Sequence, residues 1–251
     1  MMLVENRELF KDLRKKTSSL FVGHWPCFIE MAGLFLVPVL IFKDYLWRSP
    51  WFVPLLVDTF SMHLFPAVVL FVKAVFVLYF LLFLAAVIKA IAQADRGGNP
   101  QAISSYRQAM GILDAYLWVK ILFVFKVFCW SLLLVVPGII FGVFYNFAGM
   151  ALAVDGIGGV EALRHSKKII KNNLSAYLLS VTAALSLFFL FSFVFLASLD
   201  TMIAFFLLQG NDLMAQAVDY LEIALVTMGG IVFLVFYYYL YQAIKGRGGY
   251  R

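Results

Sequence analysis

Long apolar runs, separated by short polar segments, follow one another along the whole chain. Six of these runs are long enough, or nearly so, to cross a hydrocarbon core that needs about 20 helical residues. They cover approximately residues 25–42, 65–88, 115–136, 138–154, 174–199 and 220–244. The pattern predicts an all-α fold, a polytopic transmembrane helix bundle with six spans, in which residues 1–251 form a single integral membrane domain.

The third and fourth predicted spans meet at Pro137 and Gly138. Proline can begin a helix there because the first helical N–H group has no partner within the helix. Gly138 and Gly142 have a spacing that lets membrane helices approach closely. We expect Pro137, Gly138 and Gly142 to serve helix packing. Between the last two spans, residues 201–209 fit either a segment that lies flat on the membrane or one that dips into it.

The polar segments also carry a pattern. In residues 9–16 and 160–171, apolar side chains recur at helical spacing on one face and basic side chains on another. A faint repeat points to a third such segment, because residues 105–107 and 166–168 are each followed, at the same offset, by Leu-x-Ala-Tyr-Leu. We therefore expect short amphipathic helices before spans 1, 3 and 5, lying in the plane of the lipid headgroups.

Positive charge collects on one side of this arrangement. The basic residues on that side are Arg7, Lys11, Arg14, Lys15, Lys16, Lys89, Arg96, Arg107, Arg164, Lys167, Lys168, Lys171, Lys245, Arg247 and Arg251. The opposite side carries only Lys43 and Arg48, and its last loop carries Asp200, Asp212, Asp219 and Glu222. Since Lys and Arg are retained in cytoplasmic loops, the bias predicts that both termini are cytoplasmic.

Composition supports a membrane protein and excludes several other classes. Hydrophobic residues make up 64% of the chain and charged residues 14%, against about 45–50% and about 25% in soluble domains. The net charge of +6 is explained by the cytoplasmic loops, so we expect no nucleic-acid partner. Cys27 and Cys129 lie in apolar runs and support no disulfide framework. His24, Cys27 and Glu30 recur every three residues but match no metal motif, so we expect neither metal nor cofactor.

Charged residues inside the predicted spans are candidates for function, because charge is costly in a bilayer. Lys126 lies near the middle of span 3 and needs a carboxylate, backbone carbonyls, a water-filled cavity or an anionic ligand. The alternative to a functional role is a structural pairing or a modest cavity. Lys120 and Glu30 enter their spans at similar depths and could pair as a buried bridge, which is the structural alternative for both. Lys73 lies inside span 2, or near the outer interface if that span begins later.

The segment at residues 160–171 carries a candidate lipid-binding surface. Its basic residues Arg164, Lys167, Lys168 and Lys171 would face the headgroups, and each base near an anionic leaflet contributes about 1 kcal/mol. The alternative is a solvated charged loop whose only role is to fix the topology. The sequence favours neither reading over the other.

Residues 136–173 read VPGIIFGVFYNFAGMALAVDGIGGVEALRHSKKIIKNN. This pattern of Pro-Gly-Ile, a short span, an acidic-Gly turn, Glu-Ala-Leu-x-x-Ser and a basic helix resembles the membrane domain of the glycerophosphoryl diester phosphodiesterase family and its six-helix relatives. The entry to span 3 at residues 115–118 also looks like that family. The resemblance implies a six-helix protein of the bacterial cytoplasmic membrane. It does not imply the phosphodiesterase reaction, which in the fused enzymes belongs to a separate barrel domain of about 250 residues.

No enzyme signature stands out in the chain, which has no phosphate-binding loop, no HExxH and no Gly-x-Ser-x-Gly. We therefore expect a non-enzymatic membrane module that binds lipids, with a protein partner or a second copy of itself as further candidates. The alternative is a small transporter or channel with an anionic or lipid-like substrate near Lys126. Few polar residues lie within the spans, which counts against a permeation path.

Overall fold

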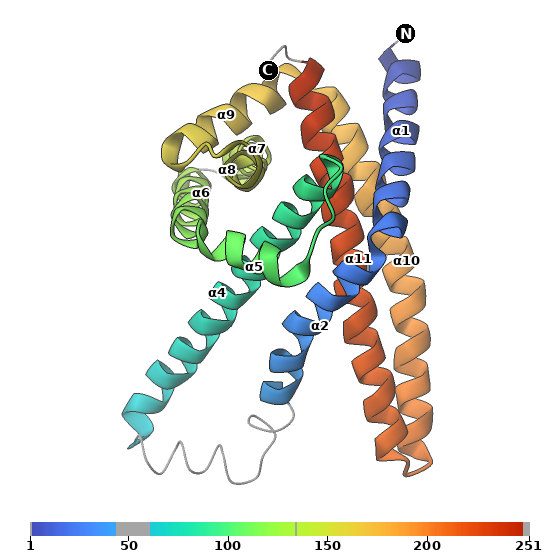
Figure 1. Cartoon of the computed structure of the whole chain (residues 1–251). Helices are drawn as coiled ribbons and strands as arrows, with labels where there is room; N and C mark the ends of the chain where they lie inside the picture. Colours follow the sequence, from blue (N-terminus) through green and yellow to red (C-terminus); the bar gives the residue numbers. More distant parts are fainter. Residues whose placement is uncertain (1, 44–60, 134, 248–251) are drawn as a thin grey trace.

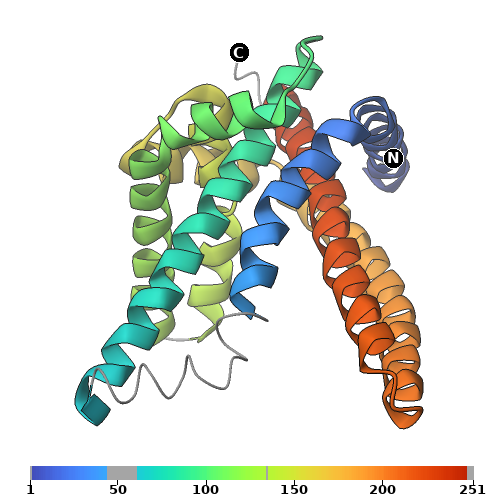
Figure 2. The same ribbon diagram turned by 60° about the horizontal axis from the view of Figure 1, so that its bottom comes forward.

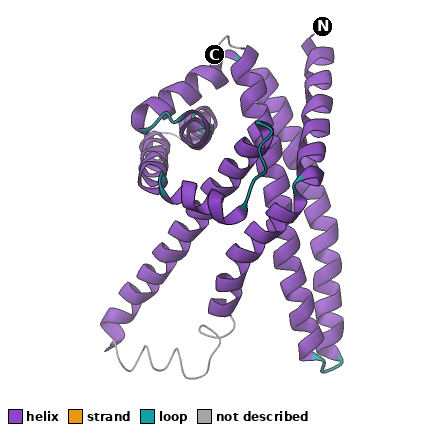
Figure 3. Ribbon diagram, viewed as in Figure 1, coloured by secondary structure: helices purple, strands orange, loops and turns teal. Residues whose placement is uncertain are grey.

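The computed structural model describes residues 2–43, 61–133 and 135–247, and these residues form helices joined by short loops (Figure 3). The helices are α1 (Met2–Gly23), α2 (Trp25–Ile41), α4 (Ser61–Asp95), α5 (Ala102–Met110), α6 (Leu113–Leu133), α7 (Val135–Phe144), α8 (Ala148–Asp155), α9 (Gly159–Asn172), α10 (Leu174–Leu208) and α11 (Asp212–Arg247). No strand occurs within those ranges. The predicted all-α class is confirmed for the described part of the chain.

Five helical segments are long and apolar enough to cross a membrane. They are Leu70–Asp95, Leu113–Leu132, Val135–Asp155, Leu174–Leu208 and Asp212–Arg247. The pair α1 and α2 passes the same test when taken together, although the two helices are bent by 76° at their junction. The chain is therefore a multi-pass integral membrane protein with five or six helical spans.

The long helices run back and forth between two ends of the molecule. Both termini lie at the same end, here called the terminal end, and the turn between α10 and α11 lies at the opposite end (Figure 1). Figure 2 shows α1, α5 and α9 at the terminal end, running across the direction of the long helices. The α10–α11 hairpin diverges from the other long helices toward the opposite end (Figure 2).

The packed core lies nearest the terminal end. In the second half of α4, small residues such as Ala85, Ala86 and Ala90 are fully buried, and they let α8 and α11 approach closely. Toward the opposite end, large apolar side chains are open, including Phe71 on α4 and Phe193 on α10, which are 70% and 76% exposed. Such exposure of large apolar side chains suits contact with lipid tails rather than water.

Helix α2 contains Pro38, which cannot donate the N–H group that would normally satisfy the carbonyl of Leu34. The hydroxyl of Tyr79 on α4 donates a hydrogen bond to that carbonyl instead. Tyr106 on α5 likewise donates to the carbonyl of Met31, at 3.2 Å. These two tyrosines attach α2 to the neighbouring helices, and Tyr79 does so at a carbonyl that the helix itself leaves unsatisfied.

The fourth predicted span differs from its expected form. We expected one helix over residues 138–154 after a break at Pro137 and Gly138. Instead α7 already begins at Val135, with Pro137 in its first turn, where a missing N–H group costs nothing. A second break, which was not expected, occurs within this span at residues 145–147, where a turn separates α7 from α8.

Two further boundaries also differ from the prediction. Helix α4 continues to Asp95, beyond the expected end of span 2 at residue 88. Residues 201–208 neither lie flat nor form a re-entrant loop, because α10 continues as a helix to Leu208 and only residues 209–211 form the turn. The predicted outer base Arg48 lies outside the described residues.

Candidate functional site

Helix α9 has a buried face and a charged face. Its buried residues are Ala162, Leu163, Ser166, Ile169 and Ile170. Arg164, Lys168 and Lys171 are exposed on the other side, and Arg164 pairs with Glu161 at 2.8 Å. The ammonium of Lys167 lies 5.1 Å from the centre of the Phe141 ring on α7, which partly offsets its charge. The four predicted basic residues thus lie on one helix, and at least three of them, Arg164, Lys167 and Lys168, interact with groups of the protein itself.

Ser166 connects α9 to the break between α7 and α8. Its hydroxyl donates to the carbonyl of Phe144 at 2.7 Å and accepts from the N–H of Phe147 at 3.0 Å. Both backbone groups lie where the helix is interrupted, so neither is satisfied by the regular helical pattern. Ser166 is fully buried, and no water is needed to satisfy these groups. The serine expected on the apolar stripe of α9 therefore holds the interrupted span together.

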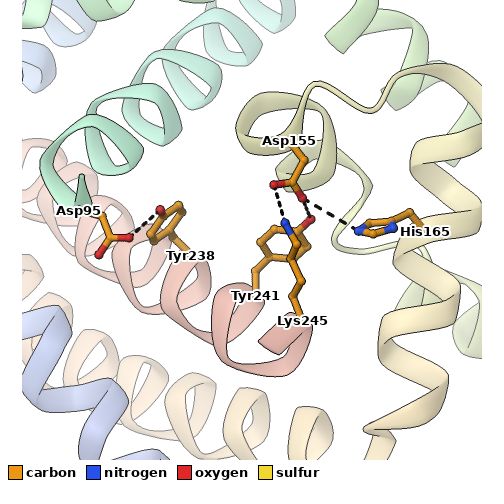
Figure 4. A network of polar contacts seen from close by, with 6 residues as sticks. All are labelled: Asp95, Asp155, His165, Tyr238, Tyr241 and Lys245. Carbon is orange, nitrogen blue, oxygen red and sulfur yellow. Dashed lines mark hydrogen bonds and ion pairs between the residues drawn. The ribbon is translucent and has the colours of Figure 1, made fainter. Parts of the chain in front are cut away.

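A network of polar side chains meets at Asp155, the last residue of α8 (Figure 4). The ammonium of Lys245 on α11 lies 2.8 Å from its carboxylate, and the hydroxyl of Tyr241 donates a hydrogen bond to it. The Nε2 atom of His165 on α9 lies 4.0 Å from a carboxylate oxygen of Asp155. A carboxylate at a helix C-terminus faces the negative end of the helix dipole, so these partners are needed to stabilise it there.

The imidazole of His165 is affected by its surroundings. Burial lowers the pKa of His165 from its ordinary value of 6.5, and Lys245 and Lys168 lower it further, whereas Asp155 raises it. The neutral form is therefore favoured in the folded protein. The network therefore contains one pair of opposite charges, Asp155 and Lys245, and a neutral histidine.

A second carboxylate at a helix C-terminus is held in the same way. Asp95, the last residue of α4, accepts a hydrogen bond from the hydroxyl of Tyr238 at 3.0 Å (Figure 4). Sequence reasoning missed both carboxylates and their partners. A signal was present in the run Tyr237-Tyr238-Tyr239-Leu240-Tyr241, since tyrosines gathered in one apolar helix need partners for their hydroxyl groups. The two contacts tie α4 and α8 to the final helix.

The predicted lysines on α6 have different environments. Lys126 is half-buried, and its ammonium lies 5.5 Å from the centre of the Tyr145 ring. Lys120 lies 5.3 Å from the centre of the Tyr116 ring and lines a cavity of about 300 Å³ between five helices. Of these two lysines, Lys120 is therefore the one found to line a cavity. It precedes Lys126, which the sequence favoured, along α6 and lies closer to the terminal end.

Glu30 and Lys73 lie on other helices than Lys120 and Lys126. Glu30 is exposed on α2, and in the described part of the chain no ion pair joins it to Lys120, so the expected buried bridge is not formed. Lys73 is exposed on α4, twelve residues after the helix begins at Ser61. Its exposure decides between neither of the two positions expected for it, within span 2 or near the outer interface.

Acidic residues gather near the opposite end, on helices rather than in the solvated loop that we expected. Asp200 lies on α10, and Asp212, Asp219 and Glu222 lie on α11. Asp219 pairs with Lys43, just beyond α2, at 2.6 Å. This ion pair joins the first described span to the last one.

The terminal end also holds a smaller basic cavity. It has a volume of about 260 Å³ and is lined by Lys89 and Gln93 of α4, by Arg96 directly after that helix and by Gln108. Gln93 donates to the carbonyl of Asn99 at 3.2 Å, which fixes the loop that borders this cavity. The cavity adds two cations to the charge at the terminal end.

The two glycines expected to serve helix packing differ in how closely the neighbouring helix approaches them. A Cβ atom on Gly138 would lie 2.0 Å from the Ser131 hydroxyl and 2.9 Å from the Ser131 Cα atom on α6. At Gly142 the nearest atoms belong to Val127, at an ordinary distance of 3.9 Å. Of the two glycines, Gly138 is the one that the close approach of α6 and α7 requires.

Among the residues that the structure describes, no group of three His, Cys, Asp or Glu side chains could hold a metal ion, and this includes His24, Cys27 and Glu30. Comparisons with protein families, with curated proteins and with solved structures found no match for this chain. Its function is therefore inferred from the geometry of α9 and of the intramembrane lysines.

Proposed function

We propose that this protein is a non-enzymatic, six-span protein of the cytoplasmic membrane whose basic helix α9 binds anionic lipid headgroups. The observation that carries the proposal is the division of α9 into a buried apolar face and an exposed face with Arg164, Lys168 and Lys171. A helix held in this way against the ends of the spans has its exposed cations at the level of the headgroup layer. Anionic headgroups supply the opposite charge there.

The proposed topology has both termini in the cytoplasm and α2 as the first span. It is supported by the position of both termini, α1 and α9 at one end of the molecule (Figure 1). Basic residues of α1 and α9 gather at this end, as the positive-inside rule requires of the cytoplasmic side. In this view α1 lies along the membrane surface, since the 76° bend separates it from α2.

The sequence resemblance supports the same assignment. Residues 136–173, which resemble the membrane domain of the glycerophosphoryl diester phosphodiesterase family, form α7, α8 and α9. They comprise the interrupted span and the basic helix that follows it. We infer a bacterial cytoplasmic-membrane protein related to that membrane domain, without the phosphodiesterase reaction.

The test is lipid binding by the purified full-length protein in detergent, followed by native mass spectrometry with phosphatidylglycerol and with phosphatidylcholine. The variant carries Arg164→Gln, Lys167→Gln, Lys168→Gln and Lys171→Gln. Each base contributes about 1 kcal/mol, and Arg164 and Lys167 are partly offset by their partners. The expected loss of phosphatidylglycerol affinity is therefore on the order of 30-fold, with no change for phosphatidylcholine.

The matched control keeps the positive charge on α9 and exchanges only the type of basic side chain. It carries Arg164→Lys, Lys167→Arg, Lys168→Arg and Lys171→Arg. It should bind phosphatidylglycerol as the wild type does. Unchanged binding in the glutamine variant, with its thermal stability intact, would mean that α9 only fixes the topology.

A second candidate function is a small transporter of an anionic, lipid-like substrate. One observation favours it, since the fourth span is interrupted at residues 145–147 beside the cavity that Lys120 lines. Interrupted helices at membrane depth are a feature of substrate sites in transporters. Flux of a fluorescent anionic lipid across proteoliposomes, lost in Lys120→Met and kept in Lys126→Met, would support this second candidate.

A further inference from the structure

The Lys120 cavity, defined by the side chains that line it between α4, α6, α8, α10 and α11, combines a polar part and an apolar part. Its polar part includes Lys120, Asn146 and Tyr237. Its apolar part includes Leu84, Val181 and Leu185. At about 300 Å³ it lies at the lower limit for a small-molecule site.

The polar part carries a positive charge that lacks a counter-charge. The Lys120 ammonium lies over the Tyr116 ring, and within the described residues it forms no ion pair or hydrogen bond. Lys120 lies seven residues after Leu113, the first residue of α6, or roughly 10 Å along the helix axis. An ammonium at that depth requires an anion, because burying an isolated charge is costly.

The first turn of α8 adds positive potential at the same point. A Cβ atom on Gly149 would lie 3.4 Å from the Lys120 ammonium and 3.2 Å from the Tyr116 hydroxyl, so the lysine lies directly against this turn. The N-terminus of a helix carries a partial positive charge and N–H groups without acceptors within the helix. Phe147, the residue before α8, provides no side-chain cap. A cation and a helix N-terminus in contact favour an anion beside both.

Two further polar residues line this cavity. The hydroxyl of Tyr237 is buried and interacts with Tyr177, but it forms no hydrogen bond of good geometry within the described part of the chain. The amide of Asn146 donates to the Tyr177 hydroxyl at 2.7 Å, which orients its side chain at the helix break. A buried hydroxyl without a hydrogen bond of good geometry costs free energy that a ligand acceptor would recover.

The apolar part of the cavity continues onto a surface that suits an acyl chain. Leu185 lines the cavity, and one turn further along the same face of α10 Phe189 is 65% exposed. Toward the opposite end, α10 and α11 diverge from the other spans, so this surface faces the membrane interior (Figure 2). A free inorganic anion would leave the apolar part unused, whereas an amphiphile fills both parts.

We propose that the Lys120 cavity binds the anionic headgroup of an acyl lipid, with a phosphate or carboxylate group beside Lys120 and the first turn of α8 and the acyl chain along α10. This site is separate from the α9 surface, so it does not rest on the proposed function. A chain that bound no lipid at α9 could still fill this cavity, and the reverse also holds.

The test is native mass spectrometry of the full-length protein, delipidated in detergent and titrated with phosphatidic acid, oleate, phosphatidylcholine or inorganic phosphate. One equivalent of phosphatidic acid or oleate should bind at the cavity of the wild type and should persist in the glutamine variant of α9, and the probe that binds identifies the headgroup. Lys120→Met should weaken this binding about tenfold or more, since a charge-assisted contact is lost. Lys126→Met is the matched control, because it removes the other lysine of α6 that lies over a tyrosine ring, and it should bind as the wild type does.

A second variant tests the acyl part of the proposal. Leu185→Trp fills the apolar part of the cavity and leaves Lys120 in place, so lipid binding should fall while the charge is kept. Ligand-induced thermal stabilisation of the wild type gives an independent readout if Lys120→Met does not fold. Equal binding by the wild type and Lys120→Met, or binding of inorganic phosphate but no lipid, would overturn the proposal.

Discussion

At the scale of single residues, Asp155 shows how one carboxylate can organise several helices. It ends α8, and its partners Lys245 and His165 come from α11 and α9. Asp155 and Lys245 are separated by 90 positions in the sequence, so no local pattern predicts their contact. The pair is largely buried, with 16% and 21% of the side chains exposed, and it therefore depends on both partners remaining in place.

The buried imidazole of His165 should make stability depend on pH. Because its pKa is lowered in the folded protein, the unfolded chain binds the proton more readily. The folded state is therefore penalised as the pH falls below the ordinary value of 6.5, and this contribution is absent above it. We expect the melting temperature of the wild type to fall more steeply than that of His165→Gln between pH 7.5 and pH 5.5. Parallel melting curves over this range, measured by intrinsic fluorescence in detergent, would show that His165 is not linked to folding.

Ser166 should be more important to stability than its size suggests. Ser166→Ala leaves the Phe144 carbonyl and the Phe147 N–H without partners in a buried position, at a cost of about 2–4 kcal/mol. Ser19→Ala is the control, because Ser19 bonds the carbonyl of Lys16 at an exposed position and should change stability by less than about 0.5 kcal/mol. Thermal unfolding of both variants in the same detergent checks the difference. Equal melting temperatures would mean that the break is stabilised in another way.

At the scale of elements, the α6–α7 hairpin depends on one glycine. Gly138→Ala brings a Cβ atom within 2.9 Å of the Ser131 Cα atom, and a backbone atom cannot move away as a side chain can. We expect a loss of about 2–3 kcal/mol or more for this overpacked contact. Gly142→Ala meets only ordinary contacts and should be neutral or slightly stabilising, since alanine favours helices. Comparable melting temperatures for the two alanine variants would contradict the close approach of α6 and α7 at Gly138.

The helices themselves were largely predictable, because apolar length and periodicity report burial in lipid directly. The interruption at residues 145–147 was not, since the run around it is apolar almost throughout and Asn146 is the only polar signal. The same limit applies to the candidate site. Sequence gives the depth of Lys126 and Lys120 in a span, but which of them faces a cavity depends on how α6 is rotated against helices that are distant in the sequence.

At the scale of the whole molecule, the proposed topology can be tested by labelling. In a background with Cys27→Ser and Cys129→Ser, Gln209→Cys lies at the α10–α11 turn and Lys171→Cys at the end of α9. A membrane-impermeant maleimide should label Gln209→Cys in intact spheroplasts and Lys171→Cys only after lysis. The reverse pattern would place the termini outside and remove the basis for lipid binding by α9.

The acidic residues near the α10–α11 turn have a consequence for how the chain enters the membrane. In the proposed orientation Asp200, Asp212, Asp219 and Glu222 cross to the side that is electrically positive. The transmembrane potential contributes about 2.3 kcal/mol per elementary charge per 100 mV, so it draws these carboxylates outward. The run between Lys126 and Asp155, which includes all of α7, has no acidic or basic residue, so the same field exerts almost no force on it. In this orientation we expect the membrane potential to assist the insertion of the last hairpin, whereas α7 enters by hydrophobicity alone.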